Sequence, residues 1–308
     1  MERKINQVGT GTLTVSLPAS WAKYHHLKKG DTVDVVEEEN KLVLYKPKSL
    51  EKNERIVLKI EGNDEKNLLR PIFSLYVKGV NEIEVHYEFQ QMIDYMRKAL
   101  YSLTGFDIVE EGTNYCVLKN IANLDEKEFE PSMKRLFETV IRIARESYAL
   151  IKNKEYNTLS VIGEVDRTLN KLCIFCERLV NTSGYKLVNK PSLMYFLLVR
   201  IEHIGDFYKH ICNYLMKQKK KFDLQPEVLQ IYEKTIKMLE FLYSMYRDYN
   251  PNKYGLLRSM KKEVIDKGHK LFEIVPKKQI RIVHYIVEIA GKIDNASSPM
   301  TGLEKIEK

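Results

Sequence analysis

The sequence predicts a multidomain α+β chain, in which a short β-rich segment precedes a small α/β domain and a long all-α region. Three observations predict this class. Apolar and polar residues alternate in short runs over residues 1–48, strand and helix patterns alternate over 52–122, and apolar residues recur every three or four positions over 128–298. Residues 299–308 are expected to form a C-terminal tail.

The composition is that of a globular protein. The 308 residues are 44% hydrophobic and 30% charged, which is typical of two or three folded domains. The formal net charge of +8 is compatible with nucleic acid or a membrane surface as a partner but indicates neither. No apolar run approaches the roughly 18 residues of a membrane span, and residues 1–7 lack the apolar core of a signal peptide. We therefore expect a cytoplasmic protein with no transmembrane segment.

The first 48 residues predict two hairpins around a short helix. Residues 12–17 alternate as a strand, Pro18 suits a first helical turn, and Lys29-Gly30-Asp31 marks a return turn. A second apolar set then flanks Glu39-Asn40. So few apolar residues in about 48 cannot bury a core of their own, so the segment is expected to dimerise.

The middle segment predicts a β-α-β-α-β-β order. Strands are expected over 56–60 and 83–85, helices over 63–77 and 89–103, and a final hairpin pairs 106–109 with 115–118. Asn63-Asp64 and Gly79 are the expected caps of the first helix. The segment contains no glycine-rich phosphate loop and no nucleophile beside a base. It is therefore interpreted as a structural linker, with a small-ligand sensor as the alternative.

Six apolar stripes of helical period follow. They run over 133–151, 162–179, 197–215, 226–246, 253–272 and 276–296. Two sets of three helices predict a doubled three-helix bundle. The four cysteines are expected in helix and strand interiors. Cys173 and Cys176 form a CxxC without a second pair or nearby histidines, which argues against a zinc site.

Acidic residues interrupt two of these stripes. Asp166 lies on the second stripe, and Glu202, Asp206 and His210 follow at i, i+4 and i+8 on the third. Like charges in an apolar groove repel, so one explanation is a bound hard cation such as magnesium or manganese, or iron if His210 joins. The other explanation is a salt-bridged helix edge that uses Arg200 and Lys209. Both remain open at this point.

A family resemblance is visible in the first segment. Val8, Gly9, Ser16-Leu17-Pro18 and Trp21, followed by Leu27–Asp31, resemble the AbrB/SpoVT swapped-hairpin domain. The resemblance implies a DNA-binding homodimer in which two chains exchange hairpins into one β-barrel. The positions here that match the family's DNA-binding positions are Arg3, Lys4 and Lys23, and Thr10 and Thr12 are added as candidates from their chemistry. The two threonines lie in the Gly9–Thr12 run, which stands where the family has an arginine and whose hydroxyl and N–H groups are expected at phosphates.

The helical region carries a second resemblance. Glu164–Arg167 and Arg200–Asp206 look like runs of the PhoU family, whose paired three-helix repeats carry E/D-x-x-x-D motifs that bind metal clusters. Glu202 and Asp206 match one motif, and Asp166 matches the second acid of its neighbour. Ile162 replaces the first acid of that neighbour, and only Asp294 survives in the second repeat. The resemblance thus implies at most one degenerate metal site, formed by Asp166, Glu202 and Asp206.

Together the segments resemble archaeal phosphate uptake regulators over nearly the whole chain. The resemblance implies a dimeric transcriptional regulator of phosphate uptake and homeostasis. It would bind double-stranded DNA, and its helical bundle would respond to a metal or a protein partner. The alternative is a metal-binding adaptor that acts on a phosphate transporter or sensor kinase without binding DNA. No enzyme activity is expected and no catalytic residue is predicted, because no general base, oxyanion donor or substrate pocket can be placed from the sequence.

Overall fold

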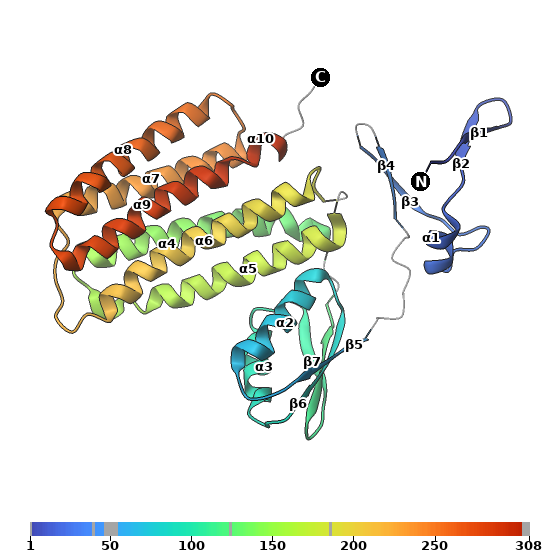
Figure 1. The fold of residues 1–308 in the computed structure, drawn as a ribbon, viewed down its shortest axis with the longest axis horizontal. Helices are drawn as coiled ribbons and strands as arrows, with labels where there is room; N and C mark the ends of the chain where they lie inside the picture. The colour runs from blue at the N-terminus through green and yellow to red at the C-terminus, as the bar shows by residue number, and fades with distance from the viewer. Residues whose placement is uncertain (1, 39–40, 46–54, 123–124, 185–186, 304–308) are drawn as a thin grey trace. The chain divides into compact units, whose positions relative to one another are not determined.

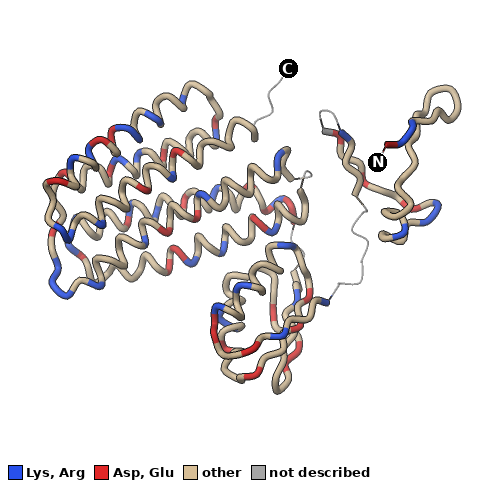
Figure 2. The backbone as a smooth tube through the Cα atoms, viewed as in Figure 1, with Lys and Arg blue, Asp and Glu red and all other residues tan. Residues whose placement is uncertain are grey.

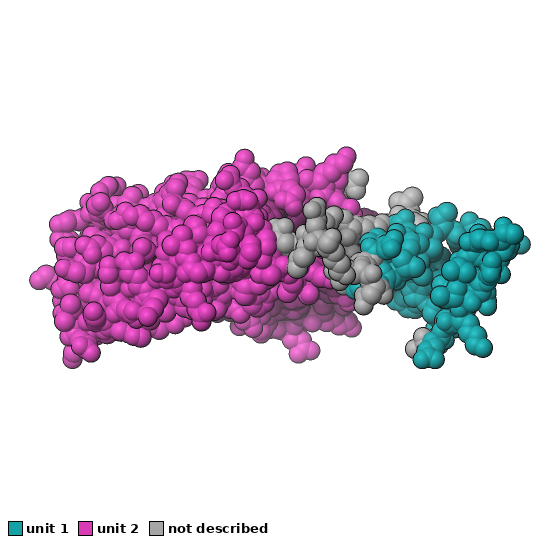
Figure 3. Space-filling view, turned by 90° about the horizontal axis from the view of Figure 1, so that it is seen from above, with its two compact units in different colours: residues 1–52 teal, residues 53–308 magenta. Residues whose placement is uncertain are grey.

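The computed structural model describes residues 2–38, 41–45, 55–122, 125–184 and 187–303. The chain divides into two compact units, Met1–Lys52 and Asn53–Lys308, which are coloured separately in Figure 3. Each unit is described by itself. The predicted turn at Glu39-Asn40 lies outside the described residues, as do residues 304–308 of the predicted tail.

The first unit contains two separate hairpins and one short helix. Strand β1 (Ile5–Val8) pairs antiparallel with β2 (Thr12–Val15), helix α1 spans Ala19–Tyr24, and β3 (Asp34–Glu38) pairs antiparallel with β4 (Lys41–Tyr45). Gly9 has a φ of +66° at the first turn, a conformation that favours glycine. None of the described residues whose burial is known in this unit is buried. The described residues of a single copy therefore form no hydrophobic core in this unit, as the sequence predicts.

The second unit begins with a four-stranded sheet and two helices. Its elements are β5 (Arg55–Ile60), α2 (Glu65–Lys78), β6 (Glu82–Tyr87), α3 (Met92–Leu100), β7 (Phe106–Glu111) and β8 (Tyr115–Asn120). The strand order is β5-β6-β8-β7, and only the β5-β6 pair is parallel. The Asp64 side chain accepts a hydrogen bond from the Lys66 backbone N–H at 2.7 Å, and Gly79 ends α2 with a φ of +99°. The predicted element order and caps are confirmed.

Helix α3 is shorter than the predicted range 89–103. The residues on either side form turns, in which Met92 N bonds Phe89 O at 3.0 Å and Leu103 N bonds Leu100 O at 3.1 Å. These i to i+3 bonds close single turns rather than continuing the α-helical ladder. Gly105, with a φ of +86°, then turns the chain into β7.

Six long helices complete the unit (Figure 1). They are α4 (Phe129–Lys152), α5 (Val161–Ser183), α6 (Pro191–Met216), α7 (Pro226–Arg247), α8 (Lys253–Ile274) and α9 (Lys277–Ser297). Short helical turns lie at Glu126–Glu128 and Tyr156–Thr158, and residues Met300–Leu303 of the predicted tail form α10. Helices α4, α5 and α6 form one set, α7, α8 and α9 the other, and the sets pack through α6 against α9 and α4 against α7. The predicted doubled three-helix bundle is confirmed.

Close approach of α5 and α6 depends on Gly205. A Cβ at this position would lie 2.3 Å from Leu169 Cδ2, closer than packed atoms can approach. The glycine therefore brings α6 near the part of α5 that carries Asp166.

Candidate functional site

The first hairpin presents two different faces. Its register pairs Ile5 with Val15 and Gln7 with Leu13, so these four residues share one face. The three apolar members are exposed: Ile5 by 68%, Val15 by 51% and Leu13 by 69%. The other face carries Asn6, Val8, Thr12 and Thr14 and is mostly polar. The hairpin thus has one apolar face that the rest of this copy leaves uncovered.

The structure places the predicted DNA-binding residues in three positions of the first unit. Arg3 and Lys4 precede β1 at the open end of the hairpin, Thr10 lies in the turn, Thr12 begins β2, and Lys23 lies in α1. Because β1 is four residues long, the open end and the turn are separated by roughly 13 Å. All five residues are exposed. One copy therefore does not gather them into a single patch.

The three cations of this set lack carboxylate partners within the described part of the chain, where no ion pair involves Arg3, Lys4 or Lys23. A surface cation without an acidic neighbour keeps its full charge for an anionic partner. This electrostatic state suits contact with phosphates.

The acidic residues of the helical region meet a lysine. Lys209 Nζ lies 2.7 Å from Asp166 Oδ2 on α5 and also bonds Asp206 Oδ1, one turn back on its own helix. The Asp166 side chain is only 4% exposed, whereas those of Lys209 and Asp206 are 22% and 28% exposed. Lys209 is one of the two residues that the salt-bridge interpretation of the sequence names, and it pairs with both carboxylates. The other, Arg200, lies over the Phe196 ring at 4.5 Å.

Burial and charge act against each other in this cluster. Burial raises the pKa of Asp166, and the bond from Lys209 opposes the rise. Burial together with repulsion from Asp206 raises the pKa of Glu202 to about 7. Burial alone favours a neutral Lys209, but its contacts with the two aspartates raise its pKa above the ordinary value. The cluster therefore holds a charged lysine between two carboxylates, with Glu202 at its edge.

The predicted metal set does not fit a metal ion in this arrangement. The Lys209 ammonium lies between the two carboxylates that an ion would have to share, and a cation is not a metal ligand. No group of three or more His, Cys, Asp and Glu side chains suited to a metal occurs among the described residues. The His210 ring lies against Phe207 and Tyr285 instead, with centroids 5.7 and 5.8 Å away.

Two polar atoms of the cluster lack partners. Asp166 Oδ1 and Asn170 Oδ1 are buried and accept no hydrogen bond from any described residue, although Asn170 Nδ2 donates to Asp166 Oδ2 at 3.4 Å. Buried oxygen atoms without a donor are costly, so a small polar species such as water would be stabilised there.

The second helix set repeats the lysine pairing. Lys261 on α8 lies 2.6 Å from Asp294 on α9, and their side chains are 28% and 24% exposed. Each helix set thus carries an acid on its helical interface and a lysine that neutralises it. In the first set the lysine lies on the third helix, and in the second set on the second helix.

Sequence reasoning missed Arg178, which is 2% exposed in α5. Its guanidinium donates to Tyr76 O, to Val80 O at 3.0 Å and to Asn81 Oδ1 at 2.7 Å, and lies over the Tyr76 ring at 4.6 Å. These groups belong to α2 and the turn after it, so Arg178 attaches the sheet domain to the bundle. The neighbouring Glu177 has its pKa raised to about 7 by burial.

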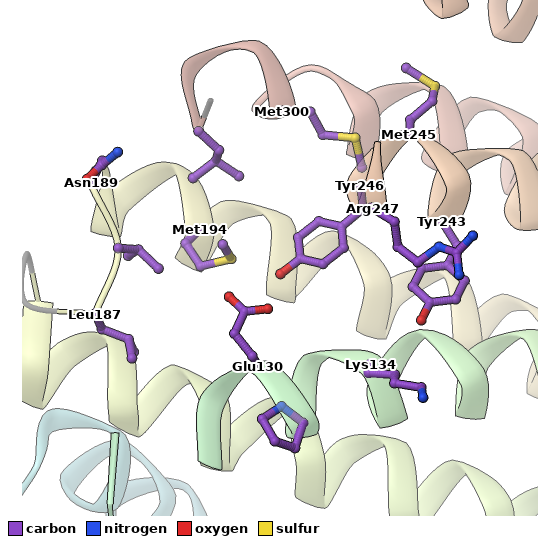
Figure 4. A pocket seen from close by; sticks show the side chains of 13 residues that line it. Glu130, Lys134, Leu187, Asn189, Met194, Tyr243, Met245, Tyr246, Arg247 and Met300 are labelled. Carbon is purple, nitrogen blue, oxygen red and sulfur yellow. The ribbon is translucent and has the colours of Figure 1, made fainter. Parts of the chain in front are cut away.

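A pocket of about 1190 Å³ lies where α4, α6, α7 and α10 meet (Figure 4). Figure 4 shows Glu130 extending towards Tyr246 and Met194, with Lys134 and Arg247 to one side. The rest of the lining is mainly apolar, including Met245 and Met300. The described lining contains no serine, cysteine or histidine, so it offers apolar contacts and three charged groups rather than a nucleophile.

The cysteines are core residues, as predicted. All four are free and buried, and burial raises the pKa of Cys176 to about 12 and that of Cys173 well above its ordinary value. Thiols in this state are unreactive.

Comparison with known proteins finds one family match and one structural likeness, each over part of the chain. Residues 7–63 match the family model of antidote-toxin recognition MazE, bacterial antitoxin. The crystal structure of the phosphate transport system regulatory protein PhoU from Streptococcus pneumoniae is similar at 16% identity, over 59% of this chain and 96% of that chain, with a TM-score of 0.49. No curated protein shows significant similarity to the chain.

The match lies on the two hairpins and continues to β5, where the sequence resemblance was seen. The structural likeness to PhoU is too distant to assign a function to the bundle. The predicted class, a β-rich first unit followed by a mostly helical region, is confirmed. The N-terminal part of the chain is therefore similar to the MazE/AbrB-like antitoxin domains.

Proposed function

We propose that the chain is a dimeric DNA-binding regulator of phosphate uptake and homeostasis, in which the first units of two copies interlace. The observation that carries this proposal is the exposed apolar face of Ile5, Leu13 and Val15 on a unit whose described residues include no buried side chain. Hydrophobic burial is the main stabilising contribution to a folded domain. A second copy supplies the apolar surface that one copy lacks.

Dimerisation also supports DNA binding. Two-fold symmetry doubles the number of exposed cations at Arg3, Lys4 and Lys23 that one assembly presents to a duplex. Phosphate contacts of this kind supply most non-specific affinity and weaken as salt is added. The match of residues 7–63 to the MazE family adds to this support.

The assignment to phosphate uptake rests on sequence. The runs Glu164–Arg167 and Arg200–Asp206 resemble those of the PhoU family, and the helices that carry them form the expected doubled bundle. The bundle is proposed as the sensing part of the regulator, in the cytoplasm. None of the helices in the described part of the chain has the length and hydropathy of a membrane span.

The dimer is tested by light scattering of the full chain during size exclusion. The wild type is expected to be a dimer, and Leu13→Asp is expected to shift it towards monomer because a charge enters the apolar face. Leu256→Asp is the matched control, since Leu256 is a 55% exposed leucine on α8 of the second unit. A monomeric wild type at micromolar concentration would contradict the proposal.

DNA binding is tested by electrophoretic shift at low and high salt. Arg3→Ala/Lys4→Ala and Lys23→Ala are expected to weaken binding to a duplex and to flatten its salt dependence. Arg258→Ala/Lys262→Ala removes two exposed cations of α8 and is expected to leave binding unchanged. Absence of a shift for the wild type at low salt would exclude DNA binding as the function.

A second candidate is a metal-binding adaptor for a phosphate transporter or sensor kinase. The unpaired Asp166 Oδ1 and Asn170 Oδ1 favour a species at the cluster, but a metal there requires Lys209 to leave both aspartates. Elemental analysis of purified protein distinguishes the two candidates. Stoichiometric metal that is lost in Glu202→Ala/Asp206→Ala would support the adaptor, and metal-free wild type that still shifts DNA would support the regulator.

A further inference from the structure

Two basic segments meet at one end of the helical bundle. Residues 217–221 follow α6, and residues 277–281 begin α9. Together they contain seven Lys or Arg and no Asp or Glu. This set, called the basic end patch below, comprises Lys217, Lys219, Lys220, Lys221, Lys277, Lys278 and Arg281. Figure 2 shows the blue backbone of the loop between α6 and α7 at this end.

Contacts of Lys278, Gln279 and Arg281 with residues that flank 217–221 hold the two segments together. Lys278 Nζ lies 4.4 Å from the centre of the Phe222 ring, and Tyr214 OH donates to Lys278 O at 2.9 Å. Gln279 Nε2 donates to Asp223 O at 3.1 Å, and the Arg281 guanidinium lies 5.0 Å from the Tyr214 ring. The patch is therefore a feature of the folded bundle and not of two independent loops.

The charges of the patch are uncompensated. All seven side chains are exposed, and none forms an ion pair with a carboxylate among the described residues. Lys221 donates to the last carbonyls of α6, Leu215 O and Met216 O, at 3.0 Å each. Nearby, Asp223 is already paired with Lys154 at 2.6 Å. The charge of the patch is thus available to an external anion.

The long sides of the bundle differ from this end. Many of their cations are paired within the surface, as in Arg142–Glu146, Arg145–Glu240, Lys237–Glu233 and Lys267–Glu263. Such pairs cancel charge locally and leave little field for a partner. The field of the basic end patch is not cancelled in this way.

Exposed apolar side chains accompany the cations. Ile274, the last residue of α8, is 66% exposed, and Ile280 on α9 is 36% exposed. Glu273 is the acid nearest to them in the chain, and it is exposed. Large aliphatic groups at a turn among lysines are typical of surfaces that lie at the headgroup level of a bilayer. A nucleic-acid backbone would neutralise the cations but leave both isoleucines in water.

We propose that the basic end patch, together with Ile274 and Ile280, docks the helical bundle on a bilayer surface that carries anionic phospholipids. The lysines and Arg281 contact the phosphate groups of the lipids, and the two isoleucines enter the boundary between headgroups and acyl chains. The contact is peripheral and sensitive to salt, because screening weakens the attraction between the patch and the lipid surface. It is independent of the first unit, which is proposed to hold DNA.

The experiment is co-sedimentation of the full chain, without DNA, with vesicles of phosphatidylglycerol mixed with phosphatidylcholine. The wild type is expected to bind these vesicles at low salt, to be released at high salt, and not to bind vesicles of phosphatidylcholine alone. Lys219→Glu/Lys220→Glu is expected to weaken binding at least about tenfold, since each cation near an anionic surface contributes roughly a fivefold factor. Neither lysine forms a hydrogen bond or ion pair with a described residue, so we expect the variant to keep the fold.

Two further variants complete the test. Arg258→Glu/Lys262→Glu makes the same charge change near the start of α8 and is expected to leave vesicle binding unchanged. Ile274→Ser/Ile280→Ser is expected to weaken binding while leaving its salt dependence intact. Equal binding of Lys219→Glu/Lys220→Glu and wild type, or no binding of the wild type at low salt, would overturn the proposal. A loss of duplex DNA binding in Lys219→Glu/Lys220→Glu, with vesicle binding unchanged, would assign the patch to DNA instead.

Discussion

Replacing Lys209 by methionine removes the ammonium group but keeps most of the apolar length of the side chain. Asp166 then has no cation beside it, although its side chain remains 4% exposed. Removing one partner of a buried ion pair costs about 3–5 kcal/mol, whereas removing one partner of an exposed pair costs about 0–1 kcal/mol. Because Lys209 and Asp206 are partly open to solvent, we expect a loss of about 3 kcal/mol at pH 7.

Protonation of Asp166 limits this loss. In the variant the Asp166 carboxyl group can stay protonated. Keeping it protonated costs about 1.4 kcal/mol for each pH unit above 3.8, its pKa in the unfolded chain. The contribution from Asp166 therefore cannot exceed about 4 kcal/mol at pH 7 or about 1.6 kcal/mol at pH 5. Since the folded pKa of the acid is raised, stability is lost as pH rises, and the effect of Lys209→Met grows from pH 5 to pH 7.

The assay is urea unfolding followed by the helical circular dichroism of the full chain at both pH values. Asp166→Asn/Lys209→Met should recover part of the loss, because no charge is then left without a partner. Lys261→Met is the matched control in the second helix set, where Asp294 is 24% exposed, and it should cost about 1 kcal/mol. A loss for Lys209→Met that is equal at pH 5 and pH 7 would refute the electrostatic explanation and indicate a packing effect.

Three other predictions concern the second unit. Glu177→Gln and Glu202→Gln should each stabilise the chain by about 1–3 kcal/mol at pH 8, with little effect at pH 5. Burial raises both pKa values to about 7, so the folded carboxyl groups hold protons that the unfolded ones release. Urea unfolding at pH 5 and pH 8 measures the change in stability. Equal changes at the two pH values would contradict the prediction. Arg178→Met should remove three hydrogen bonds to α2 and the following turn and increase hydrogen exchange there, while exchange in α8 and α9 stays unchanged. Gly205→Val should cost about 1–3 kcal/mol in urea unfolding through a clash with Leu169, and Gly163→Val, where no atom lies within 4 Å of the added Cβ, serves as the comparison.

Local patterns were sufficient to predict the helices. Each apolar stripe reflects burial on one helix face, and the structure has helices over all six predicted ranges, with ends that differ by at most six residues. The caps of α2 were also readable, because Asp64 and Gly79 act on their own helix. The ends of α3 were not, since turn bonds at Phe89 and Leu100 compete with continuation of the helix.

Helix geometry explains what happened at the acidic stripe. At about 100° per residue, His210 lies about 80° around the helix from Glu202, whereas Lys209 lies only about 20° from it. Counting in steps of four therefore placed the histidine with the carboxylates, and the structure places the lysine there. This rotation separates only the iron version of the metal interpretation, which adds His210, from the salt-bridge interpretation, which uses Lys209.

Arg178 could not be found from local pattern at all. It lies in an apolar stripe where a long side chain can equally reach solvent, and its acceptors at Tyr76, Val80 and Asn81 are about 100 residues earlier in the chain. Only the packing of α2 against α5 creates its role. Residues that join domains are thus less predictable than residues that form them.

The two units differ in how they obtain a core, and this difference bears on regulation. The second unit buries its own core, formed by residues such as Tyr208, Tyr232 and Phe137, so its folding does not depend on chain concentration. The first unit exposes Ile5 and Leu13, so in the dimer that we propose its folding is linked to association and therefore to concentration. If DNA binding requires the dimer, the fraction of DNA bound falls more steeply than the total chain concentration on dilution. The regulator that we propose would thus respond to its own abundance through the first unit, while the helical bundle stays folded.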